Sequence, residues 1–510
     1  MRSTFAGFEA SKAALFTSQK SLDITGHNLS NITTEGYTRQ RADQDSVSIA
    51  GNPTRLMPTQ VDASAMGTKI NGVSQLRDER LDAAFRTEYA TTGYYSQTST
   101  MLGDIESILQ ELDEGTAENG YNLSHYIKEM YNALEEFSHN ASSPAQAGIF
   151  SNSIMNVTTA LNEMSEDLTE CAEQYKEELY TNVGRVNTIL AGIAEYNYSI
   201  RDCIVGGSYS EQYGPNELQD KRNLLLDELA GFGELKVQAE SDGTVTVTLN
   251  GQTCVEGDVC DRINYQDNSN GTVSLYWKTN GQDATLGIGT LKAVTDILNG
   301  RGKNAYSATE STEEGFLYYQ DKLDVFAEQL ANVLNNTIPA TFNEDGTPAT
   351  YRKLVGELQA NDDGTFTVYP DMLVTADHIA VTDAVLENPG YVIYDKESTD
   401  NTYILEMIDK LTNQKIAFST GTETFTGTFA EYVTDYTSTL GSDVAYAETR
   451  YQASYTSLSE ILDNRDSVSG VSETEETVNM MTFNKAFQAA ARMMTVMDDM
   501  LDVIINQMAV

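Results

Sequence analysis

The fold of this chain is decided near its C-terminus, in the segment ETEETVNMMTFNKAFQAAARMMTVMDDMLDVIINQM at residues 473–508. Apolar residues recur in this segment at spacings of three and four: Met480, Phe483, Phe487, Ala490, Met494, Met497, Leu501, Ile504 and Met508. The spacing predicts a helix with one apolar seam, which needs a partner helix. Ser472 and Glu475 form a capping-box pattern, so we expect the helix to begin at about residue 473.

A second seam lies at the other end of the chain. Phe8, Leu15, Leu22 and Leu29 stand seven residues apart and share one face of an expected helix. A stripe of this kind is most often the core of a bundle. Its place at the chain ends nevertheless favours a contact between subunits, because terminal segments are ordered only where they dock. The C-terminal seam is also rich in Met, a side chain that tolerates imperfect packing.

Helical stripes and β-rich blocks alternate between the two seams. Long helices are predicted by the apolar stripes at 95–112, 154–193 and 316–333. This arrangement predicts an α+β multidomain fold, in which a discontinuous helical bundle or coiled coil formed by the N- and C-terminal segments carries inserted β-rich domains.

Two blocks, at about 235–290 and 340–430, are rich in β-branched and aromatic residues and contain Asp-Gly or Asn-Gly turns. Within the second block we expect strands at 365–369, 391–394 and 424–425.

These patterns divide the chain into seven parts. In chain order we expect an N-terminal assembly helix and loop (1–45), the N-terminal part of a helical core (46–235), an inserted β-rich domain (236–295), a helix returning to the core (296–340), a second inserted mixed β-rich domain (341–430), the C-terminal part of the helical core (431–470) and a C-terminal assembly helix (471–510).

The composition excludes two classes of partner. The 510 residues include 32 Lys+Arg against 76 Asp+Glu, a formal net charge of −44. Nucleic acids and anionic membrane surfaces are bound by clustered cations, so we expect neither as a partner. No run of 18 apolar residues is present, which predicts no membrane insertion. The N-terminus lacks the apolar region of a cleaved signal peptide, and four Cys are too few for a disulfide scaffold.

Motifs for catalysis are scarce. The four His residues include no H-E-x-x-H pair, and Gly287-Ile288-Gly289 opens like a dinucleotide loop but has Lys292 where the third Gly belongs. We therefore expect a turn before a helix at this position rather than a phosphate site. Whether Cys254 and Cys260 form a disulfide stays open. We predict no catalytic, cofactor-binding or metal-binding residue, and a protein that is not an enzyme.

Two terminal motifs resemble those of a known family. The segment His27-Asn28-Leu29-Ser30-Asn31-Ile32-Thr33-Thr34-Glu35-Gly36-Tyr37-Thr38-Arg39-Gln40 is similar to the N-terminal signature of bacterial flagellar rod, hook and hook-associated proteins, with Glu35 in place of the usual Pro. The segment Ser467-Val468-Ser469-Gly470-Val471-Ser472, followed by Glu475-Glu476 and Phe487–Arg492, resembles the C-terminal signature of the hook-associated members. Shorter matches lie at 137–145 and 218–229.

The resemblance implies a structural subunit at the junction between hook and filament, needed for filament assembly. Members are secreted to the flagellum through its type III export channel without a cleaved signal peptide. The implied partners are the hook protein, hook-associated protein 3, an export chaperone that binds the C-terminal helix, and further copies of the chain in a ring.

The resemblance and the seams together give two sets of candidate residues. The expected assembly interface consists of Phe8, Leu15, Leu22, Leu29, Met480, Phe483, Phe487, Met494, Met497, Leu501, Ile504 and Met508. The family motif consists of Asn28, Asn31, Gly36, Tyr37, Arg39, Gln40, Ser467, Val468, Ser469, Gly470 and Val471.

Two alternatives stay open. In the first, the chain is another flagellar axial protein, from the hook or distal rod, although the segment at 467–472 argues against this. Alternatively, it is an axial protein whose middle domains add adhesion or an enzymatic activity.

Overall fold

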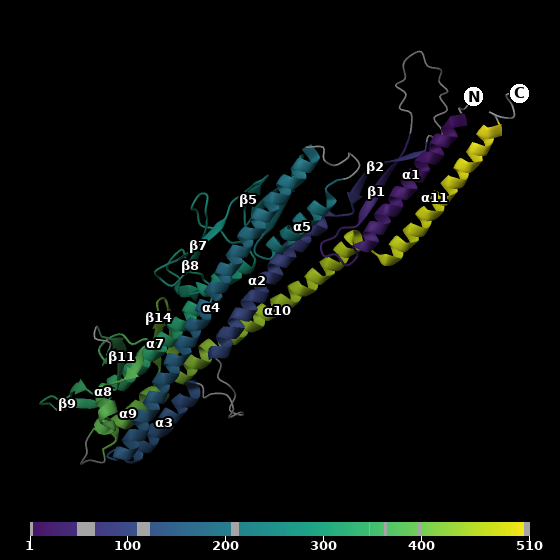
Figure 1. Ribbon diagram of the computed structural model, residues 1–510. Helices are drawn as coiled ribbons and strands as arrows, with labels where there is room; N and C mark the ends of the chain where they lie inside the picture. The colour runs from purple at the N-terminus through teal and green to yellow at the C-terminus, as the bar shows by residue number, and fades with distance from the viewer. Residues whose placement is uncertain are drawn as a thin grey trace.

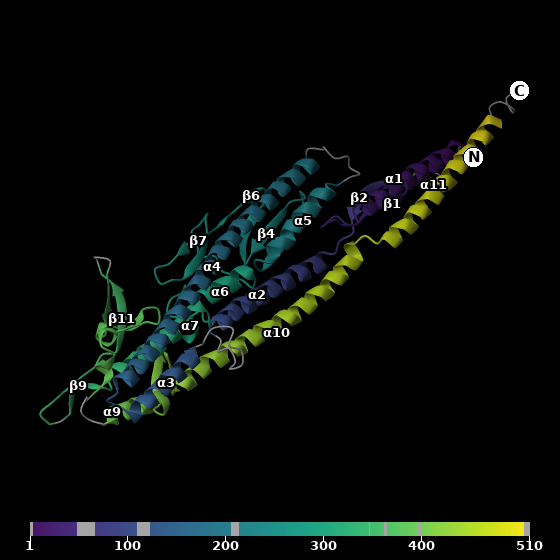
Figure 2. The same ribbon diagram turned by 60° about the horizontal axis from the view of Figure 1, so that its bottom comes forward.

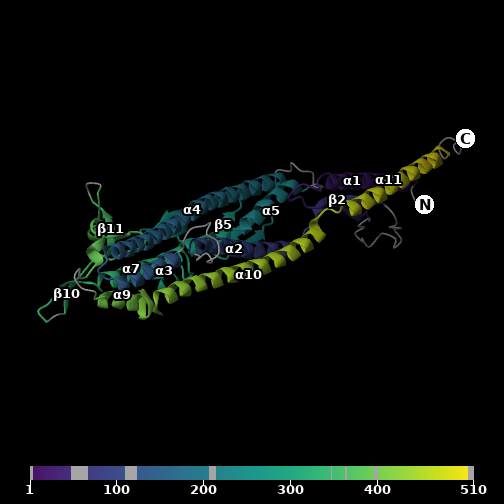
Figure 3. The same ribbon diagram turned by 90° about the horizontal axis from the view of Figure 1, so that it is seen from below.

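Three long helices give the molecule its elongated shape. They are α2 (Glu79–Leu109), α4 (Pro144–Val205) and α10 (Phe429–Ser469), which run along the body in all three views (Figures 1, 2 and 3). The computed structural model describes residues 4–47, 67–109, 123–205, 214–345, 347–361, 365–394 and 400–503. Helices and several small antiparallel sheets together confirm the predicted mixed α+β class.

The terminal helices α1 (Thr4–Ser30) and α11 (Glu473–Asp502) lie side by side at one end of the molecule, next to both chain termini (Figure 1). The helix expected from about residue 473 is therefore confirmed. Its cap is Ser472, whose hydroxyl accepts a hydrogen bond from the Glu475 N–H. The two ends of the chain form one antiparallel pair of helices with their seams available to each other.

The body is built on α4, a helix of 62 residues. The sequence showed its stripe in two parts separated by a shift, and the structure joins them in one uninterrupted helix. The shift arises because a straight α-helix drifts relative to a heptad repeat. The shorter helices α3 (Leu123–His139) and α5 (Asn216–Ala230) pack against α4. Its fully buried apolar residues include Ile154, Leu161, Leu179, Val186 and Ile193.

The first β-rich segment contains two small sheets beside α4. One has four strands in the order β3 (Leu235–Ala239), β4 (Val245–Leu249), β5 (Gln252–Glu256) and β6 (Val259–Cys260), and the other pairs β7 (Ile263–Asp267) with β8 (Val273–Trp277). In β4 and β8 every second residue is buried, as expected for strands with one face on a core. The chain then returns through α6 (Thr290–Leu298), the short helix η1 (Gly302–Asn304) and α7 (Phe316–Asn335).

The second β-rich segment lies at the end of the molecule opposite the termini (Figure 1). Its elements are the hairpin β9 (Pro339–Phe342) and β10 (Pro348–Tyr351), the sheet of β11 (Val355–Ala360), β12 (Phe366–Tyr369) and β13 (Ile379–Val381), the helices α8 (Asp383–Glu387), η2 (Pro389–Val392) and α9 (Thr402–Thr412), and the hairpin β14 (Ile416–Thr420) and β15 (Glu423–Gly427).

The prediction of a strand at 391–394 is wrong. Pro389 starts the 3-10 helix η2, which ends at Val392. Val392 and Ile393 are buried, and Arg352 donates to the carbonyl of Tyr391. Tertiary burial of these apolar residues therefore overrides their strand propensity.

One antiparallel strand pair was not predicted at all. Strands β1 (Gln40–Ser46) and β2 (Thr68–Gln75) pair from Gln40↔Gln75 to Ser46↔Thr68 and lie beside α1. Both are rich in polar residues and each has one buried residue, so neither shows the alternation of apolar residues that marks a strand in a sequence. They fall in parts that the sequence assigned to a loop and to a helical core.

Candidate assembly site

The structure gives the C-terminal seam a partner within the same chain. In the described part of α11, Ala490 is buried and six seam residues are half-buried: Met480, Phe483, Phe487, Met494, Met497 and Leu501. Phe8, Leu15, Leu22 and Leu29 of α1 are half-buried as well. Ile504 and Met508 lie outside the described residues. The two predicted seams thus belong to helices that pack on each other, and a role between subunits stays a prediction.

Close approach of α1 to its neighbours depends on small residues. A Cβ at Gly7 would collide with the side chain of Met497 on α11. On another side, a Cβ at Gly67, just before β2, would lie 3.1 Å from the backbone of Ala10 and 3.2 Å from Ala13. Helix α1 is therefore packed against α11 on one side and against the β1–β2 pair on another.

The family-motif residues meet where α1 ends, around a buried Asn28 that is 1% exposed. Its Oδ1 accepts hydrogen bonds from the Tyr37 hydroxyl (2.8 Å) and the Gln40 N–H (3.0 Å). Its Nδ2 donates to the Gln40 carbonyl (2.9 Å) and to Glu476 on α11 (3.2 Å). All four hydrogen-bonding positions of the amide are filled. We call the cluster of Asn28, Tyr37, Arg39, Gln40 and Glu476 the joint.

Tyr37 acts in the joint as a neutral hydroxyl. Burial raises its pKa, and the nearby carboxylates of Asp220, Glu217 and Glu476 raise it further. Because its one proton goes to Asn28, the hydroxyl oxygen accepts from Nδ1 of His27, 3.0 Å away. The ring of Tyr37 thereby fixes the turn after α1 against the helix itself.

Arg39 connects the joint to α10 and α11. Its Nε and one terminal nitrogen lie 2.8 and 2.7 Å from Oε1 of Glu476, and its other terminal nitrogen lies 2.8 Å from Glu475. Its backbone N–H donates to the carbonyl of Ser469, the last residue of α10 (2.9 Å). Because Glu476 is 2% exposed, this pair is a buried ion pair rather than a surface one. Of the predicted capping box, the structure has the hydrogen bond from the Glu475 N–H to the Ser472 hydroxyl. The Glu475 side chain pairs with Arg39.

The joint is anchored to the body through Asp220 of α5. Its carboxylate accepts from the Thr38 N–H (3.3 Å) and from the Gln75 amide (2.8 Å). Burial raises the pKa of Asp220, although these hydrogen bonds and Arg77 oppose the change. The turn after α1, strand β2 and helix α5 thus share one buried carboxylate.

A second buried charge cluster fixes α10 to α2 and α5 next to the joint. Asp227 accepts from Arg86 (2.8 Å) and from Arg465, and Arg465 also lies 2.9 Å from Asp82. Arg77 donates to the same Asp82 carboxylate (3.2 Å). These charges are mostly buried, so they form a network in which each carboxylate has more than one cation.

The other motif residues shape the two turns. Asn31 donates from its amide to the His27 carbonyl (2.9 Å) and closes the end of α1. In the C-terminal motif, the hydroxyls of Ser467 and Ser469 donate back into α10, while Val468 is exposed and Val471 is half-buried. A Cβ at Gly470 would lie 2.5 Å from the Asp466 carbonyl, so a glycine is needed where α10 gives way to α11.

The Gly36→Ala variant tests the first of these turns. Gly36 has φ +74°, a conformation that costs an alanine about 1–2 kcal/mol, while its space is open because the nearest atom to a Cβ is Leu224 at 3.5 Å. We expect amide exchange over residues 31–40 to rise about fivefold to thirtyfold. Gly26→Ala, inside α1 and with no atom near its Cβ, should instead slow exchange. Equal behaviour of the two variants would contradict this account of Gly36.

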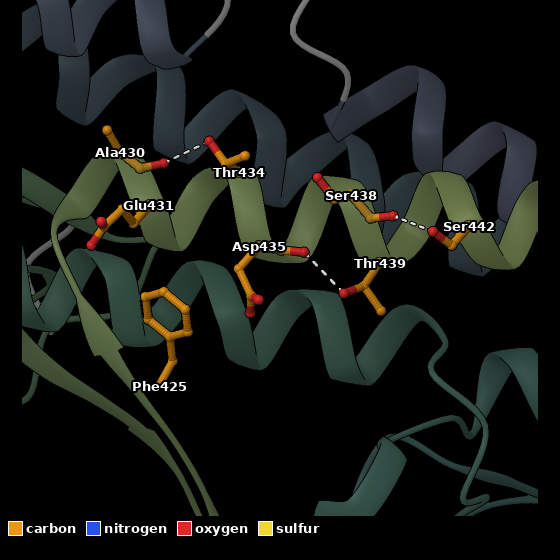
Figure 4. Close-up of a pocket in the computed structure, with 8 residues that line it drawn as sticks. All are labelled: Phe425, Ala430, Glu431, Thr434, Asp435, Ser438, Thr439 and Ser442. Atoms are coloured by element: carbon orange, nitrogen blue, oxygen red, sulfur yellow. Dashed lines mark hydrogen bonds between the residues drawn. The ribbon is translucent and has the colours of Figure 1, made fainter.

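The structure also contains a shallow groove along the start of α10, with a volume of about 540 Å³ (Figure 4). The hydroxyls of Thr434, Thr439 and Ser442 donate to carbonyls of their own helix, as the dashed lines in Figure 4 show. Glu431 is engaged in the capping box of Thr428. The groove therefore offers hydroxyls that are already engaged by the backbone of α10.

The glycine turn, the Cys residues and the metal-ligating residue types considered in the sequence form no binding site within the described residues. A Cβ at Gly289 would lie 2.5 Å from the Gly233 backbone, so the Gly287–Gly289 turn is filled by protein before α6. All four Cys are free, and burial raises the pKa of Cys254 to about 12. Over the described ranges no group of His, Cys, Asp and Glu side chains is arranged to hold a metal ion. None of the described helices combines the length and apolarity needed to cross a membrane.

The joint is the part that the seams did not predict. Asn28, Tyr37, Arg39 and Gln40 were identified by family resemblance, and the structure brings them together with the quoted Glu475 and Glu476. Sequence reasoning missed Asp220, Arg77 and Arg465. A charged side chain that becomes buried must be paired, so each of these residues implies a partner. The sequence does not say which residue that partner is.

Two family models match the chain. Residues 109–350 match the flagellar hook-associated protein FlgK helical domain, and residues 464–508 match the flagellar basal body rod FlgEFG protein C-terminal domain. The second match covers the end of α10, the following turn and α11.

Similar proteins cover the whole chain. The flagellar hook-associated protein 1 of Bacillus subtilis (strain 168) is 28% identical over 538 residues, which cover 100% of this chain and 99% of that protein. The protein of the same name from Escherichia coli (strain K12) is 22% identical, covering 97% and 98%. Among solved structures, the flagellar hook junction protein FlgK from Burkholderia pseudomallei has the same fold at a TM-score of 0.55 and 13% identity, covering 77% of this chain and 100% of that one.

Proposed function

Because this chain belongs to the bacterial flagellar rod, hook and hook-associated proteins, we propose that it is a structural subunit of the flagellum at the junction between hook and filament, needed for filament assembly. The observation that carries this function is the similarity to hook-associated protein 1 over the full length of both chains. The match of residues 109–350 to the hook-associated helical domain favours this role over that of a hook or distal-rod protein.

We further propose that assembly uses a second apolar face of α11. Val478, Met493, Val496, Met500 and Val503 are exposed, at 59%, 51%, 46%, 52% and 43%. We call these five residues the outer stripe. Met493, Val496 and Met500 each stand one residue before a seam residue, which places the outer stripe about 100° around the helix from the seam. The seam then holds α1 and α11 together, and the outer stripe faces the neighbouring subunit in a ring.

The outer stripe is also a reason to propose partners for this chain. An exposed apolar stripe near the chain end is an aggregation hazard before assembly, which is a reason for an export chaperone on the C-terminal helix. We also propose secretion to the flagellum without a cleaved signal peptide, and contacts with the hook protein on one side and hook-associated protein 3 on the other. The division into a helical core with inserts at 236–295 and 341–430 is part of the same proposal.

Removal of the gene tests the junction role. Cells without this protein are expected to build hooks but to release flagellin monomers into the medium, because no surface remains on which the filament can begin. Electron microscopy of hook basal bodies and a flagellin immunoblot of the medium measure this, and the wild-type gene on a plasmid should restore filaments. Loss of hooks as well would point to a hook or rod protein, and normal filaments would contradict the proposal.

A further inference from the structure

A cleft of about 300 Å³ lies far from the terminal helices, between α7, the segment after α6 and the tip of the β14–β15 hairpin. Asp321, Asp324 and Glu328 line one wall, at positions that share a face of α7. The remaining wall comes from the stretches 301–306, 373–375 and 419–421. Nothing in the junction role uses these residues, so their chemistry needs a separate account.

Asn304 lines this cleft and carries a buried hydrogen-bond donor without an acceptor. The residue is 2% exposed, and its Oδ1 accepts from the Thr422 N–H and hydroxyl, each at 3.0 Å. Because a backbone N–H can only donate, this contact fixes the orientation of the amide. The Nδ2 that remains has no partner among the described protein atoms. A buried amide donor without a partner is unfavourable, so a ligand that supplies an acceptor would be stabilised at this position.

The α7 wall supplies hydrogen-bond acceptors. Asp324 accepts from the Ala376 N–H (2.8 Å), and burial, with Asp321, Glu357 and Asp377 nearby, raises its pKa to about 6. Asp321 is paired with Arg301 at 3.0 Å. Glu328 has no ion pair within the described part of the chain, and the three carboxylates do not form a metal-binding group there. A ligand in the cleft therefore meets carboxylate acceptors on one side and an amide donor on the other.

Two exposed apolar side chains stand at the mouth of the cleft. Tyr306 is 69% exposed and Leu373 is 70% exposed, while Val325 and Val374, which also line the cleft, are buried. The face of an aromatic ring carries partial negative charge and attracts polarised C–H groups. The mouth thus offers a flat surface next to polar groups that converge inside.

These features select the ligand by its chemistry. An anion is repelled by the carboxylates, and a simple cation leaves the Asn304 donor unpaired. A hydroxyl group donates to a carboxylate and accepts from an amide, so neighbouring hydroxyls on a ring satisfy both walls. The C–H face of such a ring packs on Tyr306. We propose that this cleft binds a neutral, hydroxyl-rich saccharide, with one sugar ring held between Asn304 and the α7 carboxylates and stacked on Tyr306.

The volume supports a short contact rather than deep enclosure. At about 300 Å³ the cleft is at the lower limit of small-molecule sites, so it takes one or two sugar units of a longer glycan. Two of the elements that line it, α7 and the β14–β15 hairpin, lie away from the terminal helices (Figure 1). The activity is a binding function in addition to the junction role and does not depend on it.

The test uses the purified full-length protein on an array of neutral glycans, with saturation-transfer difference NMR on methyl hexosides as the solution probe. Wild type is expected to bind a subset of the neutral glycans. Asn304→Asp keeps the oxygen that Thr422 needs and removes the donor, so it should weaken binding at least fivefold. Tyr306→Ala, at an exposed position, should weaken it by a similar factor and keeps the test open if Asn304→Asp does not fold.

Tyr446→Ala is the matched control, because Tyr446 is 62% exposed on α10 and does not line the cleft. It should leave glycan binding unchanged. The proposal is overturned if no neutral glycan binds, or if binding survives both Asn304→Asp and Tyr306→Ala. Binding of a lysine-rich peptide that depends on Glu328 in place of glycans would assign the cleft to a cationic partner and would also overturn it.

Discussion

Val496→Asp is expected to abolish incorporation of this protein into the flagellum while leaving the isolated chain folded. Val496 is half-exposed in the middle of the outer stripe, so in the monomer an aspartate at this position stays in water. Between subunits the same carboxylate would enter an apolar contact without a partner and cost several kcal/mol. Cells carrying this variant should resemble the gene deletion, with hooks present and flagellin in the medium.

Two further variants near the end of α11 make the result specific. Thr495→Asp adds the same charge on the exposed polar side of the helix and should assemble normally. Leu501→Asp places the charge in the seam, so it should speed amide exchange in α1 already in the monomer, which Val496→Asp should not do. If Val496→Asp supports normal filaments, or if it loosens α1 as Leu501→Asp does, the outer stripe is not the contact between subunits.

Arg39→Ala is expected to loosen the contact between α11 and the turn that follows α1. The substitution leaves the Glu476 carboxylate buried with amide hydrogen bonds but without a cation, and breaking a buried ion pair in this way costs about 3–5 kcal/mol. Amide exchange in α1 and α11 should rise about a hundredfold or more, whereas exchange in α4 should stay as in the wild type. Hydrogen–deuterium exchange with mass spectrometry on the full-length protein measures both regions at once.

Arg41→Ala is the control for charge at nearly the same position. Arg41 pairs with Asp43 at 3.2 Å with its side chain 62% exposed, so its loss should change stability by less than about 1 kcal/mol. The double variant Arg39→Ala with Glu476→Ala removes both charges and should recover part of the lost protection. If Arg39→Ala leaves exchange in both terminal helices unchanged, the joint does not hold them.

The sequence predicted the terminal helices because their apolar residues repeat with the helical period. Met494 and Leu501 carry that signal wherever the partner is. The sequence therefore predicted a bundle of the two terminal segments but did not show that α11 packs on α1 of its own chain. The joint carries no such period. Arg39 and Glu476 are 437 positions apart, and a polar pair shows nothing in a single sequence that would connect its members. Arg39 was identified only by the family resemblance, which gives no physical reason for its presence.

The errors have the same origin. At 391–394 the residues Tyr-Val-Ile-Tyr favour a strand locally, but the packing of Val392 against the core decides the conformation. Strands β1 and β2 are polar, and within the described residues they pair with each other, so long-range hydrogen bonding and not an apolar pattern defines them. The cleft lined by Asn304 is likewise formed by segments between residues 301 and 421. No local sequence pattern predicts that these segments come together.

The 62-residue helix α4 gives the molecule a mechanical property. At 1.5 Å per residue it is a beam about 93 Å long, and it contacts elements of both β-rich segments, from β5 and β7 to β13 and η2. Both segments are therefore mounted on one stiff member and rotate with it as a unit. Among the described residues, the chain joins the terminal pair to the body between β2 and α2, next to Arg39, and at Gly470 between α10 and α11. We expect the molecule to bend first at these two places, because α4 runs without a break through the body.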